Sequence, residues 1–123
     1  MARNTQQIGR KGELLVQYKL LKFGIDSAPL TTDRGVDLVA YDPSTKQVVT
    51  IQVKATETHR GKWKPQWVEW SIPPDMDLRA QYIAVVDLKR DMGWLFKAEE
   101  AKKFAVKKGV NPKVLWWYVP EDT

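Results

Sequence analysis

The stretch that decides the fold is residues 33–55, DRGVDLVAYDPSTKQVVTIQVKA. Two runs rich in β-branched residues, Val36–Tyr41 and Lys46–Ala55, flank a turn at residues 42–45. The turn reads Asp-Pro-Ser-Thr. Proline presets φ in such a turn, and the Asp and Ser side chains cap its backbone. The stretch therefore predicts an antiparallel β-hairpin.

The register of this hairpin decides where Asp37 lies. If residues 42–45 form a four-residue loop, Tyr41 pairs with Lys46, and Asp37 falls opposite Thr50. A slip by one residue would turn Asp37 to the other face of the sheet. The pattern therefore predicts one definite position for this acid.

Two polar side chains of the second strand share a face with Asp37. Because side chains alternate along a strand, Gln52 and Lys54 lie on the same face. In the register above, Asp37 is diagonal to Gln52 and within side-chain reach of it. The opposite face is apolar and is predicted to be buried; it carries Val49, Ile51 and Val53. An acid, an amide and a lysine thus converge on one patch, which folding alone does not require.

A helix is predicted ahead of the hairpin, from Gln6 to Phe23, with Gly24 as the residue that ends it. Its apolar stripe is expected to face the sheet. Glu13 borders this stripe, so its carboxylate is expected to point along the packing interface. Gly12 beside it allows the helix to approach the sheet closely. A solvated helix carboxylate is the alternative interpretation of Glu13.

These residues together match a known pattern. Asp37, the turn and the run IQVK at residues 51–54 resemble the active-site hairpin of the PD-(D/E)XK nuclease superfamily, and Glu13 matches the family's helix glutamate. Restriction endonucleases, archaeal Holliday-junction resolvases and some intron-encoded endonucleases belong to this superfamily. The resemblance covers residues 9–55 and implies a restriction endonuclease-like α/β fold, with a central mixed β-sheet flanked by α-helices. The sequence departs from the family at Gln52, where a second acid is usual.

The resemblance implies a metal-dependent endonuclease that hydrolyses DNA phosphodiester bonds, with Mg²⁺ as cofactor and Mn²⁺ able to substitute. Carried over residue by residue, the catalytic set is Glu13, Asp37, Gln52 and Lys54. The metal ligands are Asp37, the amide oxygen of Gln52 and the backbone carbonyl of Val53. Glu13 would hold a metal-bound water or a second ion, and Lys54 would orient the attacking water or act as the base. Since Gln52 adds no charge, Asp37 and Glu13 balance one divalent ion.

The segment after the hairpin, residues 56–66, reads TETHRGKWKPQ. Cations contact phosphates without regard to sequence, and an aromatic ring stacks on a base or wedges between bases. The expected DNA contacts are therefore His59, Arg60, Lys62, Trp63 and Lys64. The alternative is a solvated basic loop in which Trp63 packs back onto the core and His59 is simply exposed.

Beyond this loop the pattern predicts four more strands and a second helix. The strands are expected at residues 67–72, 81–88, 94–96 and 114–119, and the helix at residues 97–108. A short turn or helical bridge is expected at residues 75–79, and an edge strand ahead of the hairpin at residues 25–30. The run YIAVV within residues 81–88 is typical of a central strand buried on both faces. Asp87 at its end is expected to be structural.

Composition bounds the class of protein. The 123 residues predict one domain over residues 1–123, and the net charge of +5 favours a polyanionic partner such as DNA. The absence of cysteine excludes disulfides and a cysteine nucleophile, and a single histidine excludes a His-rich zinc site. No apolar run approaches membrane-spanning length, and the N-terminus lacks a signal-peptide core. We expect no membrane association and a cytoplasmic protein, nucleoid-associated if bacterial, archaeal or viral.

Palindromic or branched DNA requires two active sites, and a chain of this size has one, so a homodimer is expected. Two other classes of function remain open. A catalytically silent DNA-binding module would carry the same basic loop on the same fold. A protein-interaction module would use the aromatic surface instead.

Overall fold

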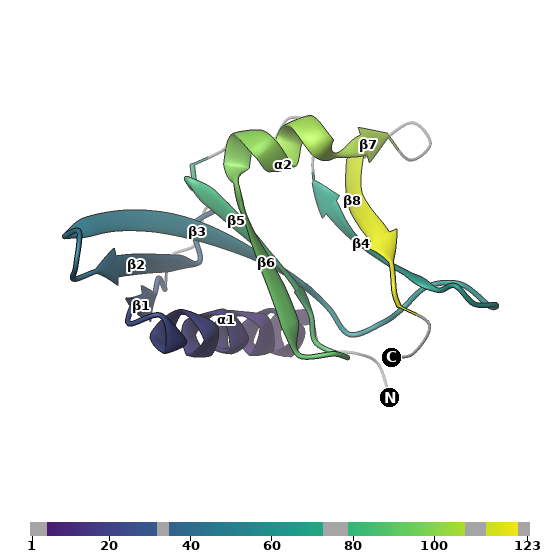
Figure 1. Cartoon of the computed structure of the whole chain (residues 1–123), viewed down its shortest axis with the longest axis horizontal. Coiled ribbons are helices and arrows are strands. Elements are labelled where there is room, and N and C mark those ends of the chain that lie inside the picture. The colour runs from purple at the N-terminus through teal and green to yellow at the C-terminus, as the bar shows by residue number, and fades with distance from the viewer. Residues whose placement is uncertain (1–4, 32–34, 73–78, 108–112, 121–123) are drawn as a thin grey trace.

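The computed structural model describes residues 5–31, 35–72, 79–107 and 113–120 (Figure 1). Helix α1 spans Thr5–Lys22 and helix α2 spans Ala98–Phe104. The strands are β1 (Asp26–Pro29), β2 (Leu38–Asp42), β3 (Gln47–Thr56), β4 (Trp67–Ile72), β5 (Tyr82–Asp87), β6 (Met92–Lys97), β7 (Val106–Lys107) and β8 (Lys113–Tyr118). Neither helix in the described part of the chain has the length and apolar character that crossing a bilayer requires.

The strands form two sheets. The larger sheet has the order β1-β2-β3-β5-β6; β3 and β5 run parallel, and its other neighbouring strands are antiparallel. The smaller, antiparallel sheet has the order β4-β8-β7. The expected α/β fold, with a central mixed sheet and flanking helices, is confirmed. The chain adds a second sheet because β4 pairs with β8 rather than with a strand of the larger sheet.

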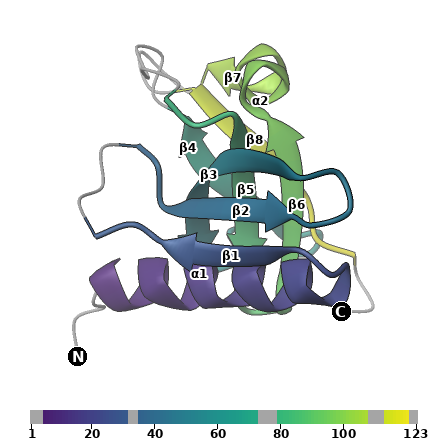
Figure 2. The ribbon, with the colours of Figure 1, turned by 90° about the vertical axis from the view of Figure 1, so that its left-hand side faces the viewer.

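Two hydrophobic cores lie on the two faces of the five-stranded sheet. One is shared with α1 and includes Val16 and Ile51. The other is shared with β4, β8 and α2 and includes Trp70 and Leu115. Figures 1 and 2 show α1 along one side of the larger sheet, with α2 and β7 at the opposite end of the molecule. Burial of these two apolar surfaces drives the layers together.

Strand β5 contributes to both cores. Ile83 and Val85 belong to the core shared with β4, and Ala84 and Val86 belong to the core shared with α1. All four are at most 2% exposed, so the predicted central strand is confirmed. Because neighbouring strands align their side chains, residues of β3 that pair with Ile83 and Val85 share the face directed toward β4.

Gly12 sets the distance between α1 and β3. A Cβ atom at this position would lie 2.6 Å from Ala55 Cβ and 3.3 Å from Val53 Cγ1, closer than carbon atoms pack. The predicted close approach of the helix to the sheet is therefore confirmed. Gly24 has a φ of +76° and follows the end of α1, as the sequence predicts.

The hairpin forms, but its register differs from the predicted one. Tyr41 pairs with Val48, so the predicted pairing of Tyr41 with Lys46 is wrong. The cause is the turn, in which Lys46 adopts a φ of +61° and donates its N–H to the Asp42 carbonyl at 2.7 Å. The Ser44 hydroxyl and N–H donate to the Asp42 carboxylate at 2.7 and 3.0 Å, and these hydrogen bonds lower the pKa of Asp42.

The register is shifted by two residues, which changes partners but not faces. Thr50 pairs with Val39, so the expectation that Asp37 lies opposite Thr50 is wrong. Two residues are one full period of side-chain alternation, so the apolar face remains where it was predicted. Ile51 is buried beneath α1, and Val49 and Val53 pack against the same core.

Helix α2 is shorter than the predicted helix at residues 97–108. It ends at Phe104, and Ala105 has extended backbone with a ψ of 138°. The next two residues form β7, which pairs with β8, so strand pairing replaces the last predicted helical turn. Residue 108, the last of the predicted helix, and most of the segment predicted at residues 75–79 lie outside the described residues.

Candidate functional site

Asp37 is fixed to the edge of β3. It precedes β2 directly, and its N–H donates to the Ile51 carbonyl at 2.9 Å. Its carboxylate oxygen Oδ2 accepts a hydrogen bond from the backbone N–H of Val53 at 2.6 Å. The backbone of β3 therefore holds Asp37 through Ile51 and Val53, the two residues on either side of Gln52.

A backbone carbonyl is directed to the same edge of β3. A strand residue directs its N–H and its C=O to one side, as the double hydrogen bonds of antiparallel pairs require. Thr56 uses the side facing β5, where its carbonyl accepts from the Leu88 N–H at 2.9 Å. Val53, an odd number of residues away, uses the side facing β2, where its N–H meets Asp37. The Val53 carbonyl and the Asp37 carboxylate therefore share one edge.

Gln52 and Lys54 project from the face of β3 that is directed toward β4. In the parallel pairing with β5, Gln52 lies beside Ile83 and Lys54 lies beside Val85. Both side chains are half-buried. Among the described residues, Lys54 forms no ion pair and no side-chain hydrogen bond, so it does not pair with Asp37. A half-buried ammonium group without a partner is a costly arrangement that a bound anion or water would relieve.

Glu13 approaches β3 from the other side. Its neighbour Gly12 contacts Ala55 and Val53, which lie on the face of β3 that α1 covers. The Glu13 carboxylate is 22% exposed, and its Oε1 lies 3.3 Å from Arg10 Nη1. The solvated and the catalytic interpretations of Glu13 thus both remain predictions, and the catalytic one requires that Glu13 leave Arg10.

The donor set suits a hard cation with few protein ligands. Within the described parts of the chain, no three Asp, Glu, His or Cys side chains gather as a metal-binding group. The available oxygens are the Asp37 carboxylate, the Val53 carbonyl and the Gln52 amide. Mg²⁺ binds oxygen ligands and usually retains several waters, so this set fits Mg²⁺ better than Zn²⁺, which prefers nitrogen and sulfur. Coordination by these residues stays a prediction.

The basic loop after β3 is closed by backbone hydrogen bonds at its base and exposed at its tip. Arg60 and Trp67 exchange two backbone hydrogen bonds of 2.6 and 2.9 Å, which close the loop. At the tip, Trp63 is 76% exposed, so it does not pack back onto the core. Lys62 Nζ lies 5.5 Å from the centroid of the Trp63 ring, and Lys64 is also exposed. The loop therefore presents an aromatic ring among cations.

His59 is not exposed, which corrects the expectation for a lone loop histidine. Its side chain is 4% exposed, and Nε2 lies 2.7 Å from Asp87 Oδ2. Asp87 is completely buried and also accepts from Arg90 Nε at 2.6 Å and from the Lys89 N–H at 3.0 Å. Because a carboxylate only accepts, Nε2 of His59 carries the hydrogen. A buried acid at the end of β5 thus holds the start of the basic loop.

The hydrogen bonds decide the ionisation of Asp87. Burial on its own raises the pKa of this carboxyl group, but the bonds from Arg90 and His59 lower it, and the pKa lies below its ordinary value. Asp87 was expected to be structural, but its partners were missed. The available signal was Arg90, a cation three residues after an acid that ends a wholly apolar strand.

Comparison with known proteins identifies the fold. No protein-family model matches the chain, and no curated protein matches it in sequence. Among solved structures, a bacterial homing endonuclease, I-Ssp6803I, matches with a TM-score of 0.73 and 12% sequence identity. The match covers 98% of this chain and 79% of that chain. At this identity the likeness concerns the arrangement of the backbone, and the protein therefore shares its fold with a bacterial homing endonuclease.

Proposed function

We propose that the protein is a metal-dependent endonuclease that hydrolyses DNA phosphodiester bonds and belongs to the PD-(D/E)XK superfamily. The observation that carries this proposal is the 2.6 Å hydrogen bond that fixes the Asp37 carboxylate to Val53, between Gln52 and Lys54. The shared fold with a homing endonuclease supports it, as does the net charge of +5, which favours association with a polyanion.

The residues divide the chemical work among them. Asp37, the Val53 carbonyl and the Gln52 amide oxygen would hold Mg²⁺, for which Mn²⁺ can substitute. When bound, the ion neutralises charge on the phosphate and makes water a stronger nucleophile. Lys54, which has no partner among the described residues, would orient the attacking water and stabilise the charge that develops on the phosphate. Glu13 would hold a water at the same site once released from Arg10.

The basic loop is the proposed DNA contact. Arg60, Lys62 and Lys64 would contact phosphates, and Trp63 would stack on a base, because it is the exposed ring at the loop tip. His59 serves this surface indirectly, since it joins the loop to Asp87 instead of reaching solvent. Cleavage of both strands of a duplex requires two sites, so we propose that the active form is a homodimer.

The experiment is incubation of the protein with supercoiled plasmid and with synthetic four-way junctions, in Mg²⁺ and in Mn²⁺. Wild type is expected to nick or linearise at least one substrate, and Lys54→Ala is expected to lose this activity. The matched control is Lys46→Ala, a lysine in the turn at the far end of β3 that should leave cleavage unchanged. Equal nicking by wild type and Lys54→Ala would point to a contaminant and contradict the assignment of the site.

A catalytically silent DNA-binding module is the second candidate. The observation that favours it is the lack of a cluster of three acidic or histidine ligands among the described residues, with Gln52 in place of the usual acid. This candidate predicts salt-sensitive DNA binding, no nicking with either metal, and the same DNA affinity in Asp37→Ala as in wild type. Restoring the acid as Gln52→Glu should tighten metal binding if residue 52 is a ligand.

A further inference from the structure

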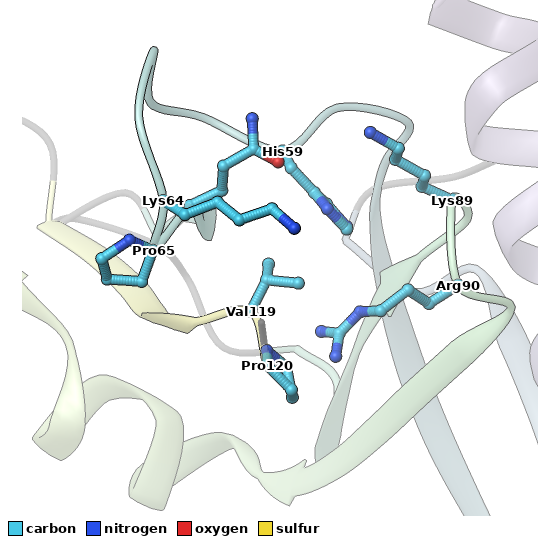
Figure 3. Close-up of a pocket in the computed structure, with 8 residues that line it drawn as sticks. His59, Lys64, Pro65, Lys89, Arg90, Val119 and Pro120 are labelled. Carbon is cyan, nitrogen blue, oxygen red and sulfur yellow. The ribbon is translucent and has the colours of Figure 1, made fainter. Parts of the chain in front are cut away.

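A small pocket lies between the basic loop and the turn that joins β5 to β6 (Figure 3). Its volume is about 140 Å³, roughly ten times the ~10–15 Å³ that one water requires. Lys64, Lys89, Arg90 and His59 line it, together with Val119 and Pro120 after β8. None of these residues belongs to the proposed cleavage site on β3.

The pocket has a rigid wall because one buried carboxylate holds two of its residues. Asp87 accepts from His59 Nε2 at 2.7 Å and from Arg90 Nε at 2.6 Å. Its second oxygen accepts from the backbone N–H groups of Lys89 and Arg90 at 3.0 and 3.3 Å. The loop and the β5–β6 turn are therefore joined through a single ionised group, and the guanidinium of Arg90 has a fixed orientation.

One donor of Arg90 has no partner. The Arg90 side chain is 8% exposed, and its Nη2 atom is buried without a hydrogen bond to any described residue. The guanidinium carbon lies 5.6 Å from the centroid of the Trp94 ring, so the ring covers the group without accepting a conventional hydrogen bond from it. Buried donors in folded proteins are nearly always satisfied, and an unsatisfied one calls for an acceptor.

The charge of the pocket points to an anionic acceptor. Lys64, Lys89 and Arg90 bring three cations to the lining, and none of the described lining residues is Asp or Glu. Figure 3 shows the Lys64 ammonium and the Arg90 guanidinium directed toward each other across the pocket. Asp87 lies behind this wall, where Arg90 neutralises its charge and His59 forms a hydrogen bond with it. Like charges that converge in this way are stabilised by a bound anion.

We propose that this pocket binds a phosphate group, with Arg90 Nη2 donating to one oxygen and the ammonium groups of Lys64 and Lys89 approaching the others. A tetrahedral oxyanion offers several acceptors to cations that arrive from different directions, and arginine presents its donors in a fixed fork. The phosphate could be a phosphodiester within a DNA strand or a phosphomonoester at a strand end. That DNA supplies it rests on the proposed function.

The pocket is placed to guide a strand past the cleavage site. Thr56 pairs with Asp87 and Lys54 pairs with Val85, so Lys54 and the acid behind the pocket are two residues apart along the paired strands. Two residues of a strand span about 7 Å. The carboxylate that holds one wall of the pocket is therefore close to Lys54 in the sheet, which fits a single DNA strand that contacts both.

Isothermal titration calorimetry with inorganic phosphate tests the pocket, with sodium chloride adjusted to keep the ionic strength constant. Arg90→Lys is expected to weaken binding by about tenfold or more, because a charge-assisted hydrogen bond is lost. Lys64→Met should weaken it by about two- to fivefold. The matched control is Lys46→Met, an exposed lysine in the turn between β2 and β3 and outside the lining, which should stay within about twofold of wild type because its charge is screened.

Equal phosphate affinity in Arg90→Lys, Lys64→Met and Lys46→Met would assign the binding to general surface charge and overturn the proposal. Circular dichroism confirms that each variant is folded, and Lys64→Met keeps the test decisive if Arg90→Lys does not fold. Asp37→Asn should bind phosphate like wild type, whether or not it cleaves DNA. Failure of the pocket is thereby separated from failure of the nuclease proposal.

Oligonucleotides with and without a 5′-phosphate distinguish the two sources of the phosphate. Fluorescence anisotropy without divalent metal compares wild type with Arg90→Lys. Loss of affinity for both oligonucleotides identifies a phosphodiester, and loss confined to the phosphorylated one identifies a strand end. Unchanged affinity for both would overturn DNA as the source.

Discussion

Asp37 beside β3 and Asp87 at the end of β5 are two acids in basic surroundings, and the two regions differ in the partners that their charged groups have. Around Asp87 the acid is fully engaged: the carboxylate is buried and accepts from His59, from the Lys89 backbone N–H and from Arg90. Asp37, just before β2, accepts from the Val53 N–H of β3, and Lys54 on β3 is half-buried without a partner among the described residues. A carboxylate that accepts several hydrogen bonds, such as Asp87, holds two segments together. A half-buried cation without a partner, such as Lys54, is available to bind a ligand. The comparison predicts that Asp87 contributes mainly to stability and that Asp37 and Lys54 contribute to the proposed cleavage.

The largest expected effect is on cleavage by Asp37→Asn. The asparagine carbonyl can still accept from the Val53 N–H, so the fold should be retained while the negative charge is lost. We expect DNA cleavage to fall by about 10²–10⁴-fold, measured as initial rates of plasmid nicking in Mg²⁺. Full activity in this variant would show that Asp37 is a structural acid like Asp87, and the comparison would fail.

Asp87→Ala should have the opposite profile, with a large loss of stability. It removes one member of a buried ionic cluster and leaves Arg90 and His59 without an acceptor, which we expect to cost about 3–5 kcal/mol in the free energy of unfolding. Urea denaturation followed by circular dichroism measures this change. Glu57→Ala is the control, because its ion pair with Lys11 is at the surface and should contribute about 0–1 kcal/mol. Similar losses in both variants would contradict a special role for burial.

Stability should also depend on pH through Asp87. Its pKa in the folded protein is lowered, so the unfolded chain binds more protons, and the free energy of unfolding rises with pH. This contribution is complete above the ordinary pKa of about 4 and is lost as the pH falls below it, with a slope of at most about 1.4 kcal/mol per pH unit. Urea denaturation of wild type and Asp87→Asn between pH 3 and 7 should give curves that converge at the acidic end. Parallel curves would mean that the group has no lowered pKa.

The smallest expected effect is on the stability of Lys54→Met. Methionine keeps most of the length of the side chain and removes a half-buried charge, so the free energy of unfolding should be unchanged or higher by up to about 1 kcal/mol. Cleavage should nevertheless be lost, which separates activity from stability at one residue. A stability loss above 1 kcal/mol would show that Lys54 has a structural partner and would weaken the contrast with the Asp87 region.

The fold was largely predictable because alternation and glycine positions are local signals. The faces of β3 follow from the order of Val, Ile, Gln and Lys along the strand, and they are insensitive to a shift of two residues. The register itself was predicted wrongly because the sequence carries no signal that Lys46 adopts a positive φ. The end of α2 was missed for a related reason, since pairing of β7 with β8 overrides a helical pattern.

The candidate site could be predicted only where it lies on one hairpin, and the roles of its residues stay predictions. The hairpin of β2 and β3 brings the Asp37 carboxylate to the Val53 N–H, and Gln52 and Lys54 share one face of β3. The pairing of His59 with Asp87 joins positions 28 residues apart and depends on β3 and β5 running parallel, which no short pattern reveals. The buried state of His59 was therefore outside the reach of sequence reasoning, although the exposed tip at Trp63 was not.

The contact between Gly12 and Ala55 has an evolutionary consequence. Two small residues on facing elements fix the height at which Glu13 sits above β3, and a methyl group on either partner uses all the available space. Variation at the two positions must then be concerted: a homologue with alanine at position 12 is expected to carry glycine at position 55. Such a compensated exchange would show that the distance between α1 and β3 is conserved, and not the identity of either residue alone.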